Sequence, residues 1–134
     1  MTLNAEARQS LIEAAVQARR WAYAPYSKYA VGAALLTLSG KIYVGVNVEN
    51  AAYPATMCAE RVAVFKAVSE GEHQFEAIAV ITSNGGAPCG SCRQVLAEFG
   101  LDTLVLMATA EGQLVQEITL GELLPGAFTP KYLE

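Results

Sequence analysis

The sequence predicts an α/β fold in which helices pack on the faces of a sheet that contains parallel strands. Along most of the 134 residues, segments with helical spacing of apolar residues alternate with short apolar runs typical of buried strands. The predicted order is helix, strand, strand, helix, strand, helix, strand, followed by a final strand and a short helical turn. Strand–helix–strand units of this kind form parallel pairs with their helices on the sheet faces.

The first helix is expected over residues 5–22. Asn4 can cap it, because a short polar side chain at this position accepts a hydrogen bond from a free backbone N–H group. Pro25 ends the helical pattern, since proline lacks the N–H donor that would continue a helix. The apolar residues that recur at intervals of three and four, and so share one helix face, are Leu11, Ile12, Ala15 and Val16.

Two strands and a long loop come next. The apolar runs 31–38 and 41–46 flank Ser39-Gly40, which predicts a hairpin with a two-residue turn. Residues 47–56 then form a loop of a length that is uncommon in a small domain. Because such loops are often functional, this segment is a candidate part of a binding site.

The second half of the chain alternates helices and strands. A helix is expected over residues 58–70. Thr119 and Glu122 have the spacing of a capping box, which predicts a short helix that ends at Pro125. The remaining elements are expected to be a strand at 75–82, a helix at 90–99, and strands at 103–108 and 114–119.

Composition narrows the class of protein. The length suits a single domain over residues 1–134. The net charge of −4 argues against nucleic acid or an anionic membrane as a partner. The sequence has no signal-peptide pattern at its N-terminus and no apolar run long enough for a membrane span, so we expect a cytoplasmic protein. A hydrophobic fraction of 53% favours apolar surface that meets another subunit.

Three cysteines, Cys58, Cys89 and Cys92, are candidate functional residues. An odd number argues against a disulfide scaffold, which leaves either free buried thiols or the ligands of one metal ion. Cys89 and Cys92 are three residues apart where a helix begins, which suits a thioredoxin-like redox pair or half of a metal site. Cys58 also opens a predicted helix after a strand and a loop, so all three sulfurs can meet at one end of the sheet.

The number of ligands favours a catalytic zinc ion. Zinc prefers four ligands, and structural zinc sites normally take all four from the protein. The single histidine, His73, follows the far end of the helix expected at 58–70 and is therefore a poor candidate for the fourth ligand. Three protein ligands with one open position are the arrangement of a catalytic zinc.

Glu60 and Arg61 carry charges that would act beside a catalytic zinc ion. Side chains tilt toward the N-terminal end of a helix, so Cys58 and Glu60 can reach the same point beyond that end. A carboxylate beside a zinc-bound water can act as a general base and then as a general acid. Arg61 can donate a hydrogen bond to the sulfur of Cys58 and offset its negative charge. The alternatives are a first-turn acid that interacts with the helix dipole and a surface arginine.

Together, "CAERVAV" and "PCGSCRQVL" resemble the zinc-dependent cytidine deaminases, whose motif includes a glutamate that does not bind the metal. The resemblance runs from "PYSKYAVGAAL" to "LLPGAFTP" and is to the short, three-cysteine, homotetrameric type. It implies a three-layer α/β/α fold with a mixed five-stranded sheet and helices on both faces. It also implies hydrolytic deamination of cytidine and deoxycytidine to uridine and deoxyuridine, with release of ammonia, in pyrimidine salvage.

The resemblance implies a role for each matching residue. One zinc ion per subunit would be held by Cys58, Cys89 and Cys92, and Glu60 would move the protons. Tyr29 lies where the family often has phenylalanine, and Phe128 would reach the site of a neighbouring subunit. The residues implied to bind the substrate are Asn47, Glu49, Tyr29, Ala59 and Phe128. The residues implied to support the site from behind are Arg61, Arg93 and Gln94.

Other interpretations remain open at the level of sequence. Asn47 and Glu49 could stabilise their own loop, and Tyr29 and Phe128 could be core or interface aromatics. A relative of blasticidin S deaminase would share the zinc elements but would depart from the "NVEN" stretch. A deaminase of nucleic acids or nucleotides would typically have histidine as its first ligand. A structural zinc or redox module would have no use for Glu60.

Overall fold

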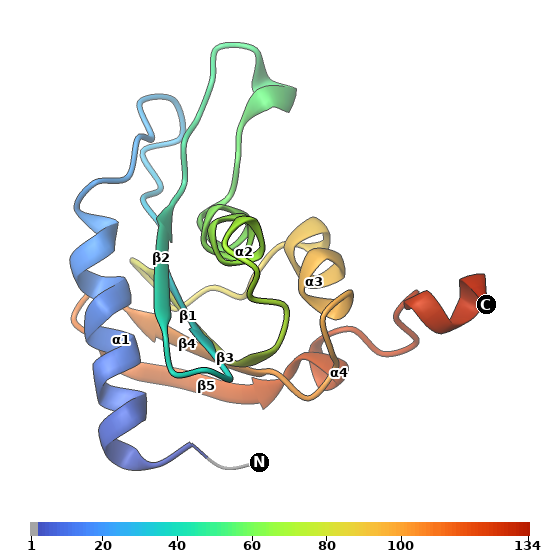
Figure 1. Cartoon of the computed structure of the whole chain (residues 1–134). Helices are drawn as coiled ribbons and strands as arrows, with labels where there is room; N and C mark the ends of the chain where they lie inside the picture. Colours follow the sequence, from blue (N-terminus) through green and yellow to red (C-terminus); the bar gives the residue numbers. More distant parts are fainter. Residues whose placement is uncertain (1–2) are drawn as a thin grey trace.

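The central strands of the protein are buried on both faces, and helices cover each face. A computed structural model describes residues 3–134 and contains one five-stranded sheet (Figure 1). All six residues of β1 (Gly32–Thr37) are buried. Because side chains alternate along a strand, β1 contributes to two separate hydrophobic cores. Ala33 and Leu35 belong to one core, and Ala34 and Leu36 belong to the other.

The sheet is mixed, as the sequence predicted. Its strand order is β2-β1-β3-β4-β5. β3 and β4 pair in parallel, and the other neighbouring strands pair antiparallel. The strands besides β1 are β2 (Ile42–Val46), β3 (Phe75–Thr82), β4 (Leu104–Thr109) and β5 (Leu114–Thr119).

The helices form the two outer layers. Helix α1 (Ala5–Arg19) packs on one face of the sheet, while α2 (Ala59–Ser69) and α3 (Gly90–Ala97) cover the other (Figure 1). The Asn4 side chain accepts a hydrogen bond from the backbone N–H of Ala7 at 2.7 Å, so the predicted cap of the first helix is confirmed. The three-layer α/β/α arrangement is therefore confirmed.

The sheet topology explains where the site forms. β2 and β3 both run antiparallel to β1, so their carboxyl ends lie at the same edge of the sheet. The chain continues from β2 through a loop to α2, and from β3 through a loop to α3. Both helices therefore begin near this edge and direct their N-termini, with their free N–H groups, toward the same region.

Several boundaries differ from the predictions. The first helix ends at Arg19 instead of residue 22, because the backbone of Tyr23 pairs with the loop after β2: its N–H donates to the Asn47 carbonyl at 2.9 Å. The hairpin turn has three residues instead of two, because the Thr37 N–H already donates to the Lys41 carbonyl at 2.9 Å. Gly40 closes this turn with a φ of 93°, a conformation that favours glycine.

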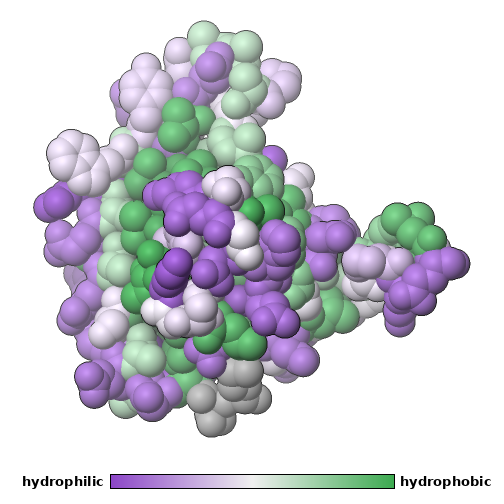
Figure 2. Space-filling view, in the orientation of Figure 1, coloured by the Kyte–Doolittle hydropathy of each residue, from purple (hydrophilic) through white to green (hydrophobic). Residues whose placement is uncertain are grey.

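The C-terminal part of the chain extends beyond the layers. The predicted capping box of Thr119 and Glu122 is present in α4 (Leu120–Leu123). A 3₁₀ turn, Pro130–Leu133, lies in a tail that projects from the body, as the red segment of Figure 1 and the space-filling view of Figure 2 show. Within residues 3–134, no helix combines the length and the apolar character that crossing a membrane requires.

Candidate metal centre and substrate pocket

The three cysteines meet where α2 and α3 begin. Cys58 is the N-cap residue of α2, and Cys89 is the N-cap residue of α3. The Cys89 sulfur lies 3.9 Å from that of Cys58 and 3.4 Å from that of Cys92, and all three Sγ atoms lie within 4.8 Å of one another. The predicted cluster of the three side chains is confirmed.

The donor set fits zinc. The sulfur separations are far longer than a disulfide bond of about 2.05 Å, so the three side chains are free thiols. Thiolate ligands in a compact group select zinc among the divalent ions common in proteins. Among residues 3–134, this is the group of His, Cys, Asp and Glu side chains that can hold a metal, and it supplies three ligands. A fourth position is left for a small molecule.

Arg61 stabilises negative charge on this cluster. Its Nη2 donates a hydrogen bond to the Cys58 sulfur at 3.3 Å, as predicted from the three-residue spacing. A hydrogen bond with Cys92, followed by the contact with Arg61, lowers the pKa of Cys58 to about 5. The same hydrogen bond with Cys58, together with burial, raises the pKa of Cys92. The contact with Arg61 therefore favours the thiolate form of Cys58.

Glu60 is a buried carboxyl group beside the thiols. It follows Cys58 in the first turn of α2, and its exposed fraction is only 5%. Burial, with a smaller effect from the charge of Cys58, raises the pKa of Glu60 to about 7. A carboxyl group in this environment can exist in either protonation state near neutral pH, which suits proton transfer.

A cavity of about 290 Å³ joins these groups to the loops around them. One part of its wall contains Cys58, Glu60 and Cys89, and another part contains Asn47 and Glu49. The volume suits a small molecule, and the mixture of apolar walls with a few polar groups is typical of a ligand site. The other residues of the wall are Ser27, Tyr29, Val31, Tyr53, Thr56, Ala59, Val80, Thr82 and Ala87.

Asn47 and Glu49 hold the loop between α1 and β1 in place. Asn47 accepts a hydrogen bond from the Val31 N–H at 2.9 Å and donates one to the Tyr29 carbonyl at 2.8 Å. Glu49 accepts from the N–H groups of Tyr26 and Ser27, each at 3.0 Å, and from the Ser27 hydroxyl. An amide and a carboxylate can each form about four hydrogen bonds, so both side chains keep some capacity for a ligand.

Tyr29 contributes its ring to the cavity wall and its hydroxyl to a contact that the sequence did not predict. The hydroxyl donates to Oδ1 of Asn84 at 2.9 Å. Ser27, Thr82 and Asn84 were also absent from the predicted site. The sequence offered one signal for Asn84, which lies just after the strand predicted at 75–82. Functional side chains often lie where neighbouring strands end at the same edge of a sheet.

A family model described as the cytidine and deoxycytidylate deaminase zinc-binding region matches residues 5–108. The chain belongs to this family. The match covers both helices that carry the cysteines, and it agrees with the zinc site that the donor set indicates. The predicted resemblance is therefore confirmed.

Individual relatives agree with the family assignment. A protein of Halalkalibacterium halodurans named cytidine deaminase is 54% identical over 91% of this chain and 94% of its own length. A cytidine deaminase of Sporosarcina psychrophila is 49% identical over 93% of each chain. The crystal structure of cytidine deaminase from Burkholderia pseudomallei superimposes with a TM-score of 0.85 at 46% identity. That superposition covers 94% of this chain and all of the other.

The remaining predicted residues lie at different distances from the cavity. Ala59 is fully buried and lies in its wall. Arg93 donates to the carbonyls of Pro88 and Leu123, both at 2.8 Å, and so ties the segment before Cys89 to α4. Gln94 instead donates to the Phe128 carbonyl at 2.6 Å and is directed toward the C-terminal tail.

Phe128 does not contribute to the cavity wall of its own chain. Its side chain is 55% exposed and stacks on Tyr132, with ring centroids 5.5 Å apart, in the projecting tail. The prediction that Phe128 reaches a neighbouring subunit remains a prediction.

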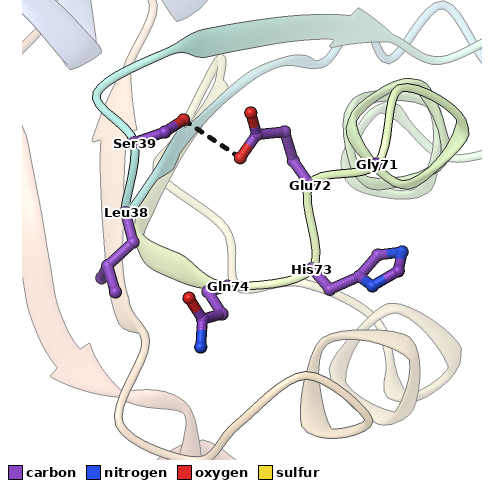
Figure 3. A pocket seen from close by; sticks show the side chains of 6 residues that line it. All are labelled: Leu38, Ser39, Gly71, Glu72, His73 and Gln74. Atoms are coloured by element: carbon purple, nitrogen blue, oxygen red, sulfur yellow. Dashed lines mark hydrogen bonds between the residues drawn. The ribbon is translucent and has the colours of Figure 1, made fainter.

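A second hollow, of about 560 Å³, lies at the opposite edge of the sheet between the hairpin turn and the segment after α2 (Figure 3). Ser39 donates to Glu72 at 3.0 Å within it, and the ring of His73 points away from the Glu72 carboxylate. The hollow is larger than the cavity at the cysteines, but none of its wall residues is a thiol or a buried carboxyl group. His73 follows the C-terminal end of α2, whereas Cys58 caps the N-terminal end of that helix.

Proposed function

We propose that this protein is a zinc-dependent deaminase that hydrolyses cytidine and deoxycytidine to uridine and deoxyuridine with release of ammonia. The observation that carries the proposal is the meeting of three thiols and a buried carboxyl group in one cavity that also contains Asn47 and Glu49. The family assignment and the names of the relatives support the same substrate class.

The thiols of Cys58, Cys89 and Cys92 would bind the zinc ion as thiolates. The ion, when bound, supplies the positive charge that activates a water molecule for attack on C4 of the cytosine ring. Arg61 and the N-termini of α2 and α3 offset the negative charge of the three sulfurs, which would otherwise weaken that activation.

Glu60 moves the protons in this proposal. Its carboxylate takes one proton from the attacking water and delivers it to N3 of the ring. It then transfers the second proton of that water to the exocyclic amino group, which leaves C4 as ammonia. The C4–O bond that forms replaces the C4–N bond that breaks, so the product is uridine. Burial beside Cys58 places the carboxyl group within the cavity and away from bulk water.

The rest of the cavity would orient the nucleoside. Asn47 and Glu49 would bind the sugar hydroxyls with the hydrogen-bonding capacity that their loop contacts leave. The Tyr29 ring and Ala59 would contact the pyrimidine. Arg93 would hold the loop before Cys89, while Gln94 would hold the tail that carries Phe128.

We further propose that the protein works as a homotetramer in the cytoplasm, in pyrimidine salvage, with Phe128 of one subunit completing the cavity of another. Large exposed aromatic side chains, including Tyr53 at the cavity and Phe128 in the tail, support a role in contacts between subunits. The net charge of −4 supports a nucleoside substrate over nucleic acid.

The test is the loss of cytidine absorbance after addition of purified protein, with cytosine and CMP measured in parallel. We expect rapid conversion of cytidine and little conversion of the free base or the nucleotide. No conversion of cytidine by zinc-loaded protein would overturn the proposal and direct attention to other amine substrates, blasticidin S among them.

A further inference from the structure

The hydroxyl of Tyr29 begins a chain of hydrogen bonds that crosses between two loops. It donates to Oδ1 of Asn84 at 2.9 Å. The same Oδ1 atom accepts a hydrogen bond from the Thr82 hydroxyl at 3.2 Å. The oxygen of Thr82 in turn accepts from the backbone N–H of Gly86 at 2.8 Å. Tyr29 is thereby tied to the end of β3 and to the segment that follows it.

The backbone of Tyr29 is tied to the other side of the cavity. Its carbonyl accepts a hydrogen bond from Asn47 at 2.8 Å, and its N–H donates to the Ser27 hydroxyl oxygen at 3.0 Å. Ser27 also donates to Glu49. Tyr29 therefore connects two parts of the wall. Its backbone contacts the part that contains Asn47 and Glu49, and its side chain contacts the segment before Cys89.

The segment 83–88 depends on such ties. It connects β3 to Cys89 and contains no helix or strand of its own. Its polar contacts to neighbouring elements run through Asn84, Gly86 and Pro88, whose carbonyl accepts from Arg93 at 2.8 Å. Because this segment lines the cavity and ends at a metal ligand, a shift in its position changes both the wall and the site.

We propose that Tyr29 and Asn84 form a positioning pair for the deamination reaction. The pair fixes segment 83–88 against the loop that carries Tyr29 before substrate binds. Substrate binding therefore does not have to supply the free energy of ordering the cavity wall. Neither side chain moves protons. The inference depends on the proposed function for its effect on cytidine, but the contact itself can be tested without catalysis.

A substitution at Gly86 can disturb the same contact between Tyr29 and Asn84. A Cβ atom at this position would lie 2.9 Å from the Tyr29 hydroxyl oxygen, and the φ of Gly86 is outside the region that only glycine favours. Gly86→Ala should therefore displace the hydroxyl without straining the backbone. In a Tyr29→Phe background, where the hydroxyl is absent, the same substitution should have little further effect.

The kinetic experiment compares Tyr29→Phe, Asn84→Ala and the double variant with the unaltered enzyme. Tyr29→Phe removes the hydrogen bond to Asn84, and Asn84→Ala removes that bond together with the one from the Thr82 hydroxyl. In both variants we expect KM for cytidine to rise about three- to tenfold with kcat within about twofold. The double variant should be no worse than the more affected single variant. Asn84→Asp, which keeps the acceptor oxygen, should restore KM. Additive single effects, or an unchanged KM, would overturn the pairing.

The matched control is Tyr43→Phe. This change also removes one tyrosine hydroxyl that donates to a side-chain oxygen, that of Glu70 at 3.2 Å, but it lies near the hairpin end of β2. KM for cytidine should stay the same in this variant. A similar rise in KM would mean that loss of stability, and not the position of segment 83–88, explains the Tyr29 result.

Backbone hydrogen exchange of segment 83–89 gives the second readout in the absence of substrate. We expect several-fold faster exchange in Tyr29→Phe and Asn84→Ala, with unchanged exchange in β4. Unchanged exchange of the segment would overturn the inference. If the unaltered protein fails to convert cytidine while the exchange result holds, the proposed function fails, and the Tyr29–Asn84 contact still orders segment 83–88.

Discussion

At the scale of single residues, side chains of the cavity wall serve the fold and the proposed chemistry together. Asn47 and Glu49 connect to four different residues of the loop before β1, yet they also border the space where a ligand would lie. A change at such a position alters stability and binding at once. The most informative substitutions are therefore those that remove one chemical property and keep the shape.

Glu60→Gln removes the proton-carrying group and keeps the size of the side chain. We expect kcat to fall by roughly 10²–10⁴-fold or more while the protein keeps its zinc, because general acid–base catalysis contributes a rate enhancement of about that size. Kinetics and metal analysis of the same sample check this. Glu98→Gln, an exposed change at the C-cap of α3, is the control. Loss of zinc in proportion to activity would show that Glu60 has a structural role instead.

Glu49 makes stability depend on pH. Hydrogen bonds from Ser27 and Tyr26 lower its pKa from the ordinary value of 4.5. Because the folded pKa is the lower one, the stabilisation is present above pH 4.5 and is lost as the pH falls through the folded pKa. Urea unfolding should show a difference between the unaltered protein and Glu49→Gln at pH 7 that shrinks as the pH falls below 4.5. A difference that stays constant over this range contradicts the assignment.

Sequence reasoning identified the residues whose chemistry is concentrated in short motifs. The cysteines, Glu60 and Arg61 lie in two local stretches, and the spacing of Cys58 and Arg61 alone predicted their hydrogen bond. The contact of Tyr29 with Asn84 joins residues 55 positions apart. No local pattern carries such a pair, because it depends on how two loops meet at the sheet edge.

At the scale of elements, the close packing of α2 on β2 places Cys58 and Glu60. A Cβ atom on Gly45 of β2 would lie only 2.4 Å from the Ala59 carbonyl oxygen and 2.6 Å from the Ala63 nitrogen. The start of α2 therefore rests directly on the strand. Glycine is required here for close approach and not for an unusual φ.

Gly45→Ala should push α2 away from the sheet. We expect a loss of about 1–3 kcal/mol in the free energy of unfolding, as for overpacked cores, together with weaker retention of zinc. Urea unfolding and zinc content after dialysis measure the two effects. Gly121→Ala, where the added atom would make ordinary contacts from 3.4 Å, is the control. Normal stability in Gly45→Ala would contradict the packing argument.

Element boundaries show where local rules are overridden. The strands at 75–82 and 114–119 were predicted to the residue, the first from an apolar run and the second from partial alternation, with clear turn signals around them. The helix expected to reach residue 22 stops at Arg19, because Tyr23 pairs with the loop after β2. The 3₁₀ turns at Tyr53–Ala55 and Pro130–Leu133 were not predicted, and each is too short to have a periodic pattern.

At the scale of the whole molecule, the projecting tail exposes apolar side chains, which supports the proposed contact with another subunit. Phe128, Tyr132 and Leu133 are exposed in the tail, where Figure 2 shows hydrophobic and hydrophilic side chains together. The α/β class of fold followed from the order of the elements, and the mixed five-stranded sheet followed from the resemblance to the family. The strand order β2-β1-β3-β4-β5 did not, since pairing between distant strands leaves no local signal.

Light scattering should give a mass of about four times 14.2 kDa for the unaltered protein if, as proposed, the tail and the cavity rim are covered by other subunits of a tetramer. Phe128→Ala should raise KM for cytidine, with a smaller effect on the unfolding of the body, from which this side chain projects. Tyr132→Phe keeps the stacked ring and is the control. A fully active monomer would contradict both the assembly and the shared site.

The most direct test of the account follows cytidine conversion while zinc is removed by a chelator and then restored. Uridine and ammonia should form in equal amounts, and the rate should rise in proportion to zinc up to one ion per chain. Activity should return when zinc is added back to protein that has kept its fold. Full activity in zinc-free protein, or no conversion by protein that holds one zinc per chain, would contradict the account.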